Sequence, residues 1–216
     1  RVYQVAFNFD TPALQDLKVR QAICSAIDKD TFCKTLLNGR GTPAVGAFPS
    51  NFEFGNNALT GPSFDREKSK SLLAQAGWTD TDGDGYVDKN GQKLTIRWLT
   101  YSSRQELPLL AEYAEANLKD IGIEVQINVT ENAKSVLASG QYDVYASSFV
   151  AAPTGDPQYF FTAHLLDESP YNVGHYHNDE ADEILDKLAT ETDEATLKQY
   201  YTRLNEIYLT DVPSFG

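Results

Sequence analysis

Residues 94–129 read LTIRWLTYSSRQELPLLAEYAEANLKDIGIEVQINV. The segments 94–101 and 123–129 are rich in apolar and β-branched residues, which is typical of buried strands. Between them, residues 107–121 carry apolar side chains at helical spacing, and Gly122 follows as a helix stop. A strand, a helix and a strand in this order predict a right-handed βαβ unit with parallel strands. The chain is therefore predicted to have an α/β fold.

The predicted unit is extended in both directions by further strands and helices. Residues 41–62 are rich in Gly, Pro, Asn and Phe and lack periodicity, so we expect a long surface connection there. With the other elements, the pattern predicts a mixed, partly parallel sheet flanked by helices. The other predicted elements are strands over 2–9 and 142–149, a helix through Leu17, Ala22 and Ile27, and helices over 31–37, 65–76, 132–138, 180–188 and 194–209.

The composition excludes some classes of partner. The chain has 216 residues and a net charge of -13 at pH 7. Such an acidic surface repels the phosphates of nucleic acid, so no nucleic-acid partner is expected. No apolar run reaches membrane-spanning length. Because the chain starts at Arg1 and contains no methionine, we expect it to be a piece of a longer mature protein.

The residue types that usually carry catalysis are sparse. His175 and His177 alternate as a metal-binding pair would, but no third ligand stands at a recognisable spacing, and two exposed loop histidines fit as well. Cys24 and Cys33 fit either a disulfide or two buried free thiols, and without a Cys-X-X-Cys pair no zinc site is expected. No nucleophile elbow, phosphate loop or dinucleotide fingerprint occurs. We therefore expect no enzymatic activity and no catalytic cofactor.

An acidic segment, residues 80–92, has the spacing of a calcium-binding loop. Alternate carboxylates can converge on one hard cation, and a glycine at the sixth position permits the sharp turn. The twelfth position is Gly91 instead of a bidentate glutamate, so an Asp/Gly-rich turn with local backbone caps is the alternative. A structural calcium ion on a hairpin is the prediction. Its ligands would be Asp80, Asp82, Asp84, the Tyr86 carbonyl and Asp88.

The end of the strand at 142–149 is the strongest candidate for a binding site. The strand leads into the loop 151–157, which reads AAPTGDP, and a predicted helical segment with three aromatic residues, 158–161, follows at once. Two prolines and a glycine fix this backbone. Ligands of open α/β sheets lie at the carboxyl ends of strands. The loop is therefore predicted to form one wall of a binding cleft, although a plain strand-to-helix connection also fits.

Seven short segments are informative as an ordered set, although each alone is a modest motif. They are Lys18–Ile23, Ala26–Lys29, Thr42–Ala44, Phe64–Trp78, Gly140–Asp143, Asp156-Pro157 and Gly174–Asp182. Together they resemble the extracellular solute-binding proteins of family 5, which are the peptide-, opine- and nickel-binding components of ABC importers. The resemblance implies a periplasmic-binding-protein-like lobe, no catalysis, and capture of a solute by closure of two lobes. It also implies a periplasmic or extracellular location, with a lipid anchor as one option.

The resemblance further implies how this chain fits into a larger protein. Residues 1–216 would be the C-terminal ligand-binding lobe, entered through a crossing segment at residues 1–10. The N-terminal lobe, the signal sequence and the final crossing strand would lie outside this chain. The implied partners are the solute, the missing N-terminal lobe and the permease of the importer.

The same resemblance bears on the solute. Peptide-binding members carry an aspartate four residues before the proline of the Asp-Pro pair, where it holds the amino terminus of the peptide. Pro153 stands at that position here. Nickel-binding members have a run closer to this one, so a nickel chelate is slightly favoured over a peptide.

The predicted cleft wall combines the ends of two strands. Arg104 would pair with a ligand carboxylate or lie free on the surface, Phe149 would offer an apolar face, and Asp156 is expected to cap the following helix rather than touch the ligand. Two other classes of function stay open, a hydrolase using clustered carboxylates and a calcium-stabilised extracellular scaffold domain. The expected ligand-binding residues are Tyr101, Ser102, Arg104, Phe149, Val150, Ala152, Pro153 and Asp156.

Overall fold

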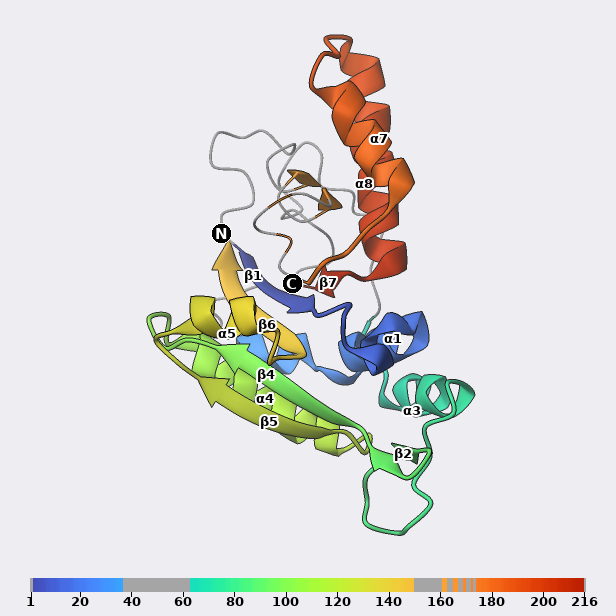
Figure 1. The fold of residues 1–216 in the computed structure, drawn as a ribbon, viewed down its shortest axis with the longest axis vertical. Coiled ribbons are helices and arrows are strands. Elements are labelled where there is room, and N and C mark those ends of the chain that lie inside the picture. Colours follow the sequence, from blue (N-terminus) through green and yellow to red (C-terminus); the bar gives the residue numbers. More distant parts are fainter. Residues whose placement is uncertain are drawn as a thin grey trace.

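The computed structural model describes residues 2–36, 63–149, 161–162, 165–166, 169, 172 and 174–215. Its centre is a five-stranded mixed sheet in the order β5-β4-β6-β1-β7 (Figure 1). β4 is parallel to both β5 and β6, whereas β1 is antiparallel to β6 and to β7. The predicted mixed, partly parallel sheet is therefore confirmed. The strands are β1 (Val2–Phe7), β4 (Thr95–Thr100), β5 (Glu124–Val129), β6 (Val144–Phe149) and β7 (Ser214–Phe215).

Helices follow the predicted pattern closely. Side-chain caps set several of their starts: Asp65 accepts the Lys68 N–H at 3.0 Å, and Asn178 accepts the Ala181 N–H at 2.9 Å. The helical elements are η1 (Pro12–Gln15), α1 (Leu17–Ala26), α2 (Lys29–Thr31), the π-helical turn η2 (Phe32–Leu36), α3 (Arg66–Gln75), α4 (Glu106–Lys119), α5 (Ala133–Ser139), α7 (Asp179–Leu188) and α8 (Glu194–Asp211).

The predicted βαβ unit is β4, α4 and β5. Its two strands pair in parallel from Thr95 opposite Glu124 to Thr100 opposite Val129. Gly122 ends the connection with φ of +86°, and a Cβ there would lie 3.0 Å from the Val87 side chain. Only glycine meets both conditions without strain, so the chain can turn from α4 to β5 at Gly122, although the helix itself ends at Lys119 rather than at the predicted residue 121.

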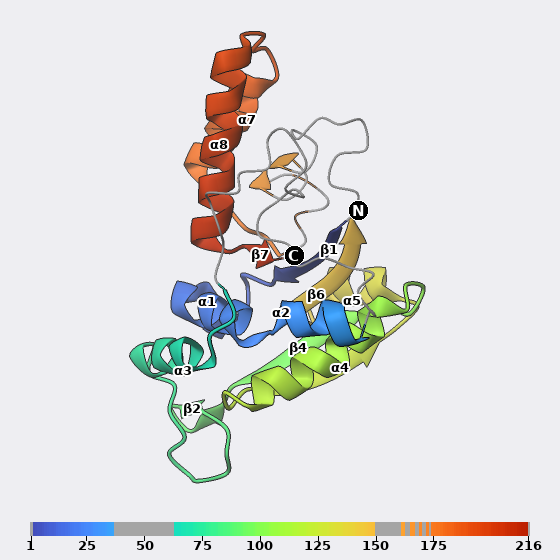
Figure 2. The same cartoon turned by 180° about the vertical axis from the view of Figure 1, so that it is seen from behind.

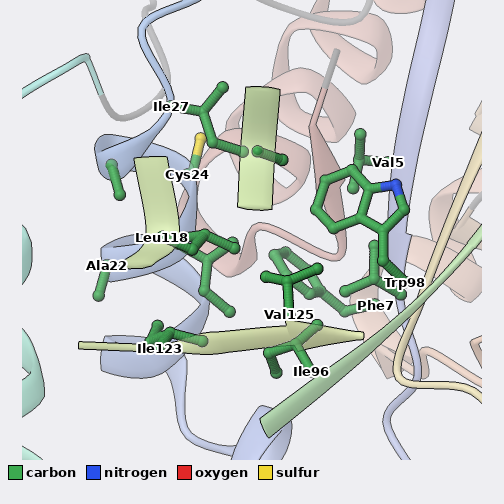
Figure 3. Packing of buried hydrophobic residues seen from close by; sticks show 14 of the residues in the cluster. Val5, Phe7, Ala22, Cys24, Ile27, Ile96, Trp98, Leu118, Ile123 and Val125 are labelled. Carbon is green, nitrogen blue, oxygen red and sulfur yellow. The ribbon is translucent and has the colours of Figure 1, made fainter. Parts of the chain in front are cut away.

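A first hydrophobic core fills the space between the sheet and the helices α1 and α4, which cover one face (Figure 2). Trp98 of β4 lies at its centre beside Val5 and Phe7, and its side chain is fully buried (Figure 3). The indole N–H of Trp98 has no hydrogen-bond partner among the residues that the structure describes. Leu118 of α4 and Ile96 of β4 pack into the same cluster. The apolar faces of the βαβ unit therefore form the main core.

A second core lies beneath the helical hairpin of α7 and α8, which stands away from the sheet (Figure 1). Phe161, Leu185, Leu204 and Tyr208 belong to it. Phe9, just after β1, packs against both cores. The two larger apolar clusters of the described residues are therefore joined near the end of the first strand.

Three predictions need adjustment. The strand expected over 2–9 ends at Phe7, because the Asn8 side chain donates to the Tyr142 carbonyl at 2.8 Å and turns the chain. The helix expected over 31–37 is a short α-helix followed by a π-helical turn. Cys24 and Cys33 are both buried as thiols and are not bonded to each other, so the disulfide option is not realised. Residues 41–62 lie outside the described residues. No helix within the described ranges is long and apolar enough to cross a membrane.

Candidate functional site

The carboxyl ends of the parallel strands β4, β5 and β6 meet at one edge of the sheet. The start of β1 lies at the same edge, because Val2 is paired with Phe149 at the end of β6. We call this edge the carboxyl rim and define it by Tyr101–Arg104, Thr130–Glu131 and the end of β6. The predicted cleft residues that the structure describes all belong to this rim.

β4 and β6 separate before they reach the rim. Their pairing covers only Trp98 opposite Val144 and Leu99 opposite Tyr145, whereas β1 pairs with β6 along its whole length. Beyond Tyr145, two side chains make the hydrogen bonds that a paired strand would otherwise make. They belong to Thr100, in β4, and to Tyr101, which follows β4.

Two hydroxyl groups bridge this separation. The Thr100 hydroxyl donates to the Ala146 carbonyl at 2.9 Å, and the Tyr101 hydroxyl accepts the Ser148 N–H at 3.0 Å. Backbone polar groups of a central strand need partners when they are buried. Thr100 and Tyr101 therefore hold the end of β6 on the side where its pairing with β4 has ended.

The ring of Tyr101 also contacts Tyr145. Their centroids are 6.3 Å apart with an angle of 46° between the planes. Burial, with a smaller contribution from Tyr101, raises the pKa of Tyr145 to about 12. At neutral pH Tyr145 is therefore a neutral phenol, suited to hydrogen bonding and poorly suited to binding a metal as a phenolate.

Ser102 connects two loops of the rim. Its hydroxyl donates to the Glu131 carboxylate at 2.6 Å, and these residues follow β4 and β5 respectively. Figures 1 and 2 place α4 on one face of the sheet and α5 on the other. The outgoing connections of β4 and β5 thus diverge to opposite faces, and open α/β sheets with such divergent connections bind their ligands at the carboxyl ends of the strands.

Arg104 is exposed on the rim, and no carboxylate in the described part of the chain pairs with its guanidinium. Close to it in sequence, Glu106 accepts the Tyr3 hydroxyl at 3.0 Å, which ties the start of α4 to β1. Arg104 is therefore the positively charged side chain of the rim. Glu131 of the rim and the nearby Glu106 each accept a hydrogen bond from a hydroxyl group.

The structure brings some of the predicted cleft residues together and leaves others undescribed. Tyr101 is hydrogen-bonded to Ser148 of β6, and Phe149 is the last residue of that strand. The two predicted residues therefore lie at the ends of neighbouring strands, as two parts of one cleft wall would. The predictions for Val150, Ala152, Pro153 and Asp156 lie outside the described residues and stay predictions.

Sequence reasoning missed four residues of the rim: Thr100, Glu131, Tyr145 and Ser148. Tyr145 and Ser147 alternate with the buried Val144 and Ala146, so the period of two in this strand could have identified Tyr145 as lying on the opposite face. No sequence signal indicates where β4 and β6 separate. The roles of Thr100 and Ser148 depend on that separation and could not be read from the pattern.

The acidic segment lies beyond the starts of β4 and β5, whereas the rim lies at the other ends of these strands (Figure 1). It leads into a small hairpin, β2 (Asp88–Lys89) and β3 (Gln92–Lys93), which precedes β4. Carboxylate oxygens of Asp80, Asp82 and Asp88 lie within 4.8 Å of one another. Three of the four predicted carboxylates are thus close enough to share one ion.

Local backbone caps occupy part of this segment. Asp80 accepts the N–H groups of Gly83 and Gly85 at 2.8 and 3.0 Å, and Asp84 accepts the Tyr86 N–H at 2.8 Å. Desolvation tends to raise the pKa of Asp80, but these N–H groups outweigh it and the pKa is lowered. The Asp88 carboxylate accepts the Thr81 N–H at 3.0 Å. Calcium binding and a capped turn are both compatible with these contacts, and the calcium site stays a prediction.

The two described histidines of the alternating pair bind separate carboxylates. His175 Nδ1 lies 2.6 Å from Asp10, whereas His177 Nε2 lies 2.7 Å from Asp179. Both rings are more than half exposed. They fit the expectation of solvent-facing loop histidines better than a shared metal site.

Comparison with known proteins gives the family. The family described as bacterial extracellular solute-binding proteins, family 5 Middle, matches residues 1–197. The oligopeptide-binding protein AppA of Bacillus subtilis (strain 168) is 28% identical over 211 residues, which are 94% of this chain and 38% of AppA. The nickel-binding periplasmic protein of Escherichia coli (strain K12) is 28% identical over 162 residues, which are 74% of this chain and 30% of that protein.

A solved structure agrees with these relatives. NikA from Brucella suis, in complex with Fe(III)-EDTA, is 26% identical with a TM-score of 0.87, covering 98% of this chain and 43% of that one. The chain thus spans less than half the length of the proteins that it matches, and these are binding proteins. With a family match over 197 of its 216 residues, the chain belongs to the bacterial extracellular solute-binding proteins of family 5.

Proposed function

We propose that the chain is the C-terminal lobe of the solute-binding component of an ABC importer. The whole protein captures a small solute between two lobes and delivers it to the permease. The observation that supports this most directly is the coverage: nearly all of this chain superposes on 43% of a solved relative. Residues 1–10, which include β1, are then the segment that crosses from the N-terminal lobe. The carboxyl rim is this lobe's side of the cleft.

The proposed solute is a nickel chelate, slightly ahead of a peptide. Relatives support both: NikA from Staphylococcus aureus was solved in complex with Ni(L-His)2, and AppA from Bacillus subtilis with a nonapeptide. Pro153 favours the chelate, because it replaces the aspartate that holds a peptide amino terminus. Arg104 suits either solute, because amino-acid chelators and peptides both carry carboxylates.

The proposed location is the periplasm or the outer face of a cell membrane, with contact to the membrane through the permease or a lipid anchor. Residues in the cleft act by binding alone, without catalysis. A scaffold domain held by calcium would need no cleft at all.

Native mass spectrometry of the full-length protein, purified from its own host, tests the solute. A bound mass matching a metal chelate supports the nickel proposal, and a co-purifying peptide overturns it. Turnover of any bound compound would contradict a pure binding function.

A charge inserted at the cleft wall tests the cleft. We expect Ala152→Asp in the full-length protein to weaken solute binding, measured by titration calorimetry. The same change at Ala195, on the exposed surface of α8, is the matched control and should leave binding unchanged. Unaltered binding by the Ala152 variant would exclude the proposed cleft wall.

A further inference from the structure

We propose that the Tyr101 hydroxyl makes two hydrogen bonds with different tasks. It fixes the end of β6 by accepting the Ser148 N–H, and it donates its own hydrogen to a carbonyl or carboxylate oxygen of the solute. This inference rests on the proposed function for its second half. It narrows the solute to compounds that present an oxygen acceptor to this lobe.

The first task follows from the separation of β4 and β6. Among the described residues, β6 after Tyr145 has a strand partner only on its β1 side. The Ser148 N–H points to the other side, where the Tyr101 hydroxyl lies 3.0 Å away. Ser148 is followed directly by Phe149, the last residue of β6. Tyr101 therefore positions the point from which the predicted cleft loop departs.

The second task follows from the chemistry of a phenol. A tyrosine hydroxyl has one hydrogen to donate in addition to its acceptor lone pairs. One lone pair of the Tyr101 hydroxyl accepts the Ser148 N–H. No acceptor for the hydroxyl hydrogen is found among the described residues of the chain. The neighbouring ring of Tyr145 restrains the orientation of the Tyr101 ring. A half-buried donor held in this way suits an acceptor that arrives with the solute.

Both proposed solutes can supply that acceptor. The amino-acid ligands of a metal chelate carry carboxylate oxygens, and a peptide carries backbone carbonyls as well. Arg104, three residues further along the same loop, adds a positive charge on the rim. A solute without an oxygen acceptor would leave the Tyr101 hydrogen unpaired inside a closed cleft, which is costly.

Tyr101→Phe in the full-length protein separates the two tasks, because it keeps the ring and removes the hydroxyl. Without solute, we expect the Ser148 amide to exchange hydrogen about fivefold faster, from the loss of one net hydrogen bond. With Ni(II) in excess L-histidine, or with a nonapeptide, we expect affinity to fall about five- to tenfold. Tyr200→Phe on α8 is the matched control and should change neither quantity.

Each of the two measurements tests one of the two proposed hydrogen bonds of Tyr101. Unchanged exchange at Ser148 would overturn the positioning role, and unchanged affinity for a bound solute would overturn the contact with it. If the wild-type protein binds neither probe nor any co-purified compound, the proposed function fails and the solute contact falls with it. The exchange rate at Ser148 would still test the positioning role by itself.

Discussion

Gly174 shows how a single residue can fix the path of a loop. A Cβ at this position would lie 1.9 Å from the Phe7 carbonyl oxygen, and the Gly174 carbonyl accepts the Phe9 N–H at 2.8 Å. The backbone of the loop thus packs directly on the end of β1. The next residue, His175, adopts a positive φ of 62°, which is uncommon for residues other than glycine.

We expect Gly174→Ala to destabilise the protein by about 2–4 kcal/mol, because the backbone of β1 must move to admit the methyl group. Gly140→Ala is the control: its φ of +73° is left-handed, unlike that of Gly174, and nothing lies within 4 Å of the added Cβ. That change should cost only about 1 kcal/mol. Urea denaturation measures both, and equal costs would show that the close contact with Phe7 does not matter.

Buried tyrosines predict an alkaline limit to stability. Burial raises the pKa of Tyr142 to about 12, as it does for Tyr145, from an ordinary value of 10.0. The folded state holds these protons more tightly than the unfolded state, so their contribution is complete below pH 10 and is lost as the pH rises toward 12. We expect the urea midpoint to fall across this window and to fall less in Tyr142→Phe. A midpoint that stays constant up to pH 12 would contradict the assignment.

At the scale of elements, the sequence predicts the helices and strands that depend on the order of residues within a single segment. The β4–α4–β5 unit could be recognised because Gly122 and the apolar spacing act within one segment. The separation of β4 from β6 could not be recognised in the sequence, because it depends on how β6 pairs with β1, which is distant in sequence. For the same reason Tyr101 was predicted from its place after a strand, whereas its partner Ser148 was missed.

The acidic segment before β4 is the element whose role is best tested by adding its ligand. We expect calcium to raise the melting temperature relative to EDTA, and at a hundred times Kd the stabilisation would be about 2.7 kcal/mol. Asp82→Asn should reduce this effect, because it removes a charge from the group of three carboxylates. Asp186→Asn on α7 is the control and should leave the calcium effect intact. A melting temperature insensitive to calcium would favour the capped turn.

At the scale of the whole molecule, a polar junction connects the two hydrophobic cores. The buried guanidinium of Arg20, on α1, donates to the Asp211 carbonyl at 2.8 and 3.1 Å. The Asp211 carboxylate at the end of α8 accepts the Tyr176 hydroxyl at 2.6 Å. Burial lowers the pKa of Arg20, although the nearby Asp211 opposes this shift. The helical hairpin is thus joined to α1 by hydrogen bonds, and Phe9 packs against both cores.

This arrangement predicts two units of local stability. Leu204→Ala, in the core under α8, should cost about 2–5 kcal/mol and accelerate amide exchange mainly in α7 and α8. Leu118→Ala, in the core under the sheet, should accelerate exchange mainly in β4, β5 and α4. Both leucines are fully buried, which makes them a matched pair. Uniform acceleration throughout the chain by either change would show a single cooperative unit.

The position of Trp98 has a consequence for spectroscopy. The chain has two tryptophans, and Trp78 also packs against the first core, whereas the second core contains tyrosines such as Tyr201 and Tyr208. Intrinsic tryptophan fluorescence therefore reports on the sheet and is nearly blind to the helical hairpin. Shielded from water, Trp98 should emit at short wavelength. Loosening of the hairpin alone would leave that emission unshifted and would have to be followed through the tyrosines.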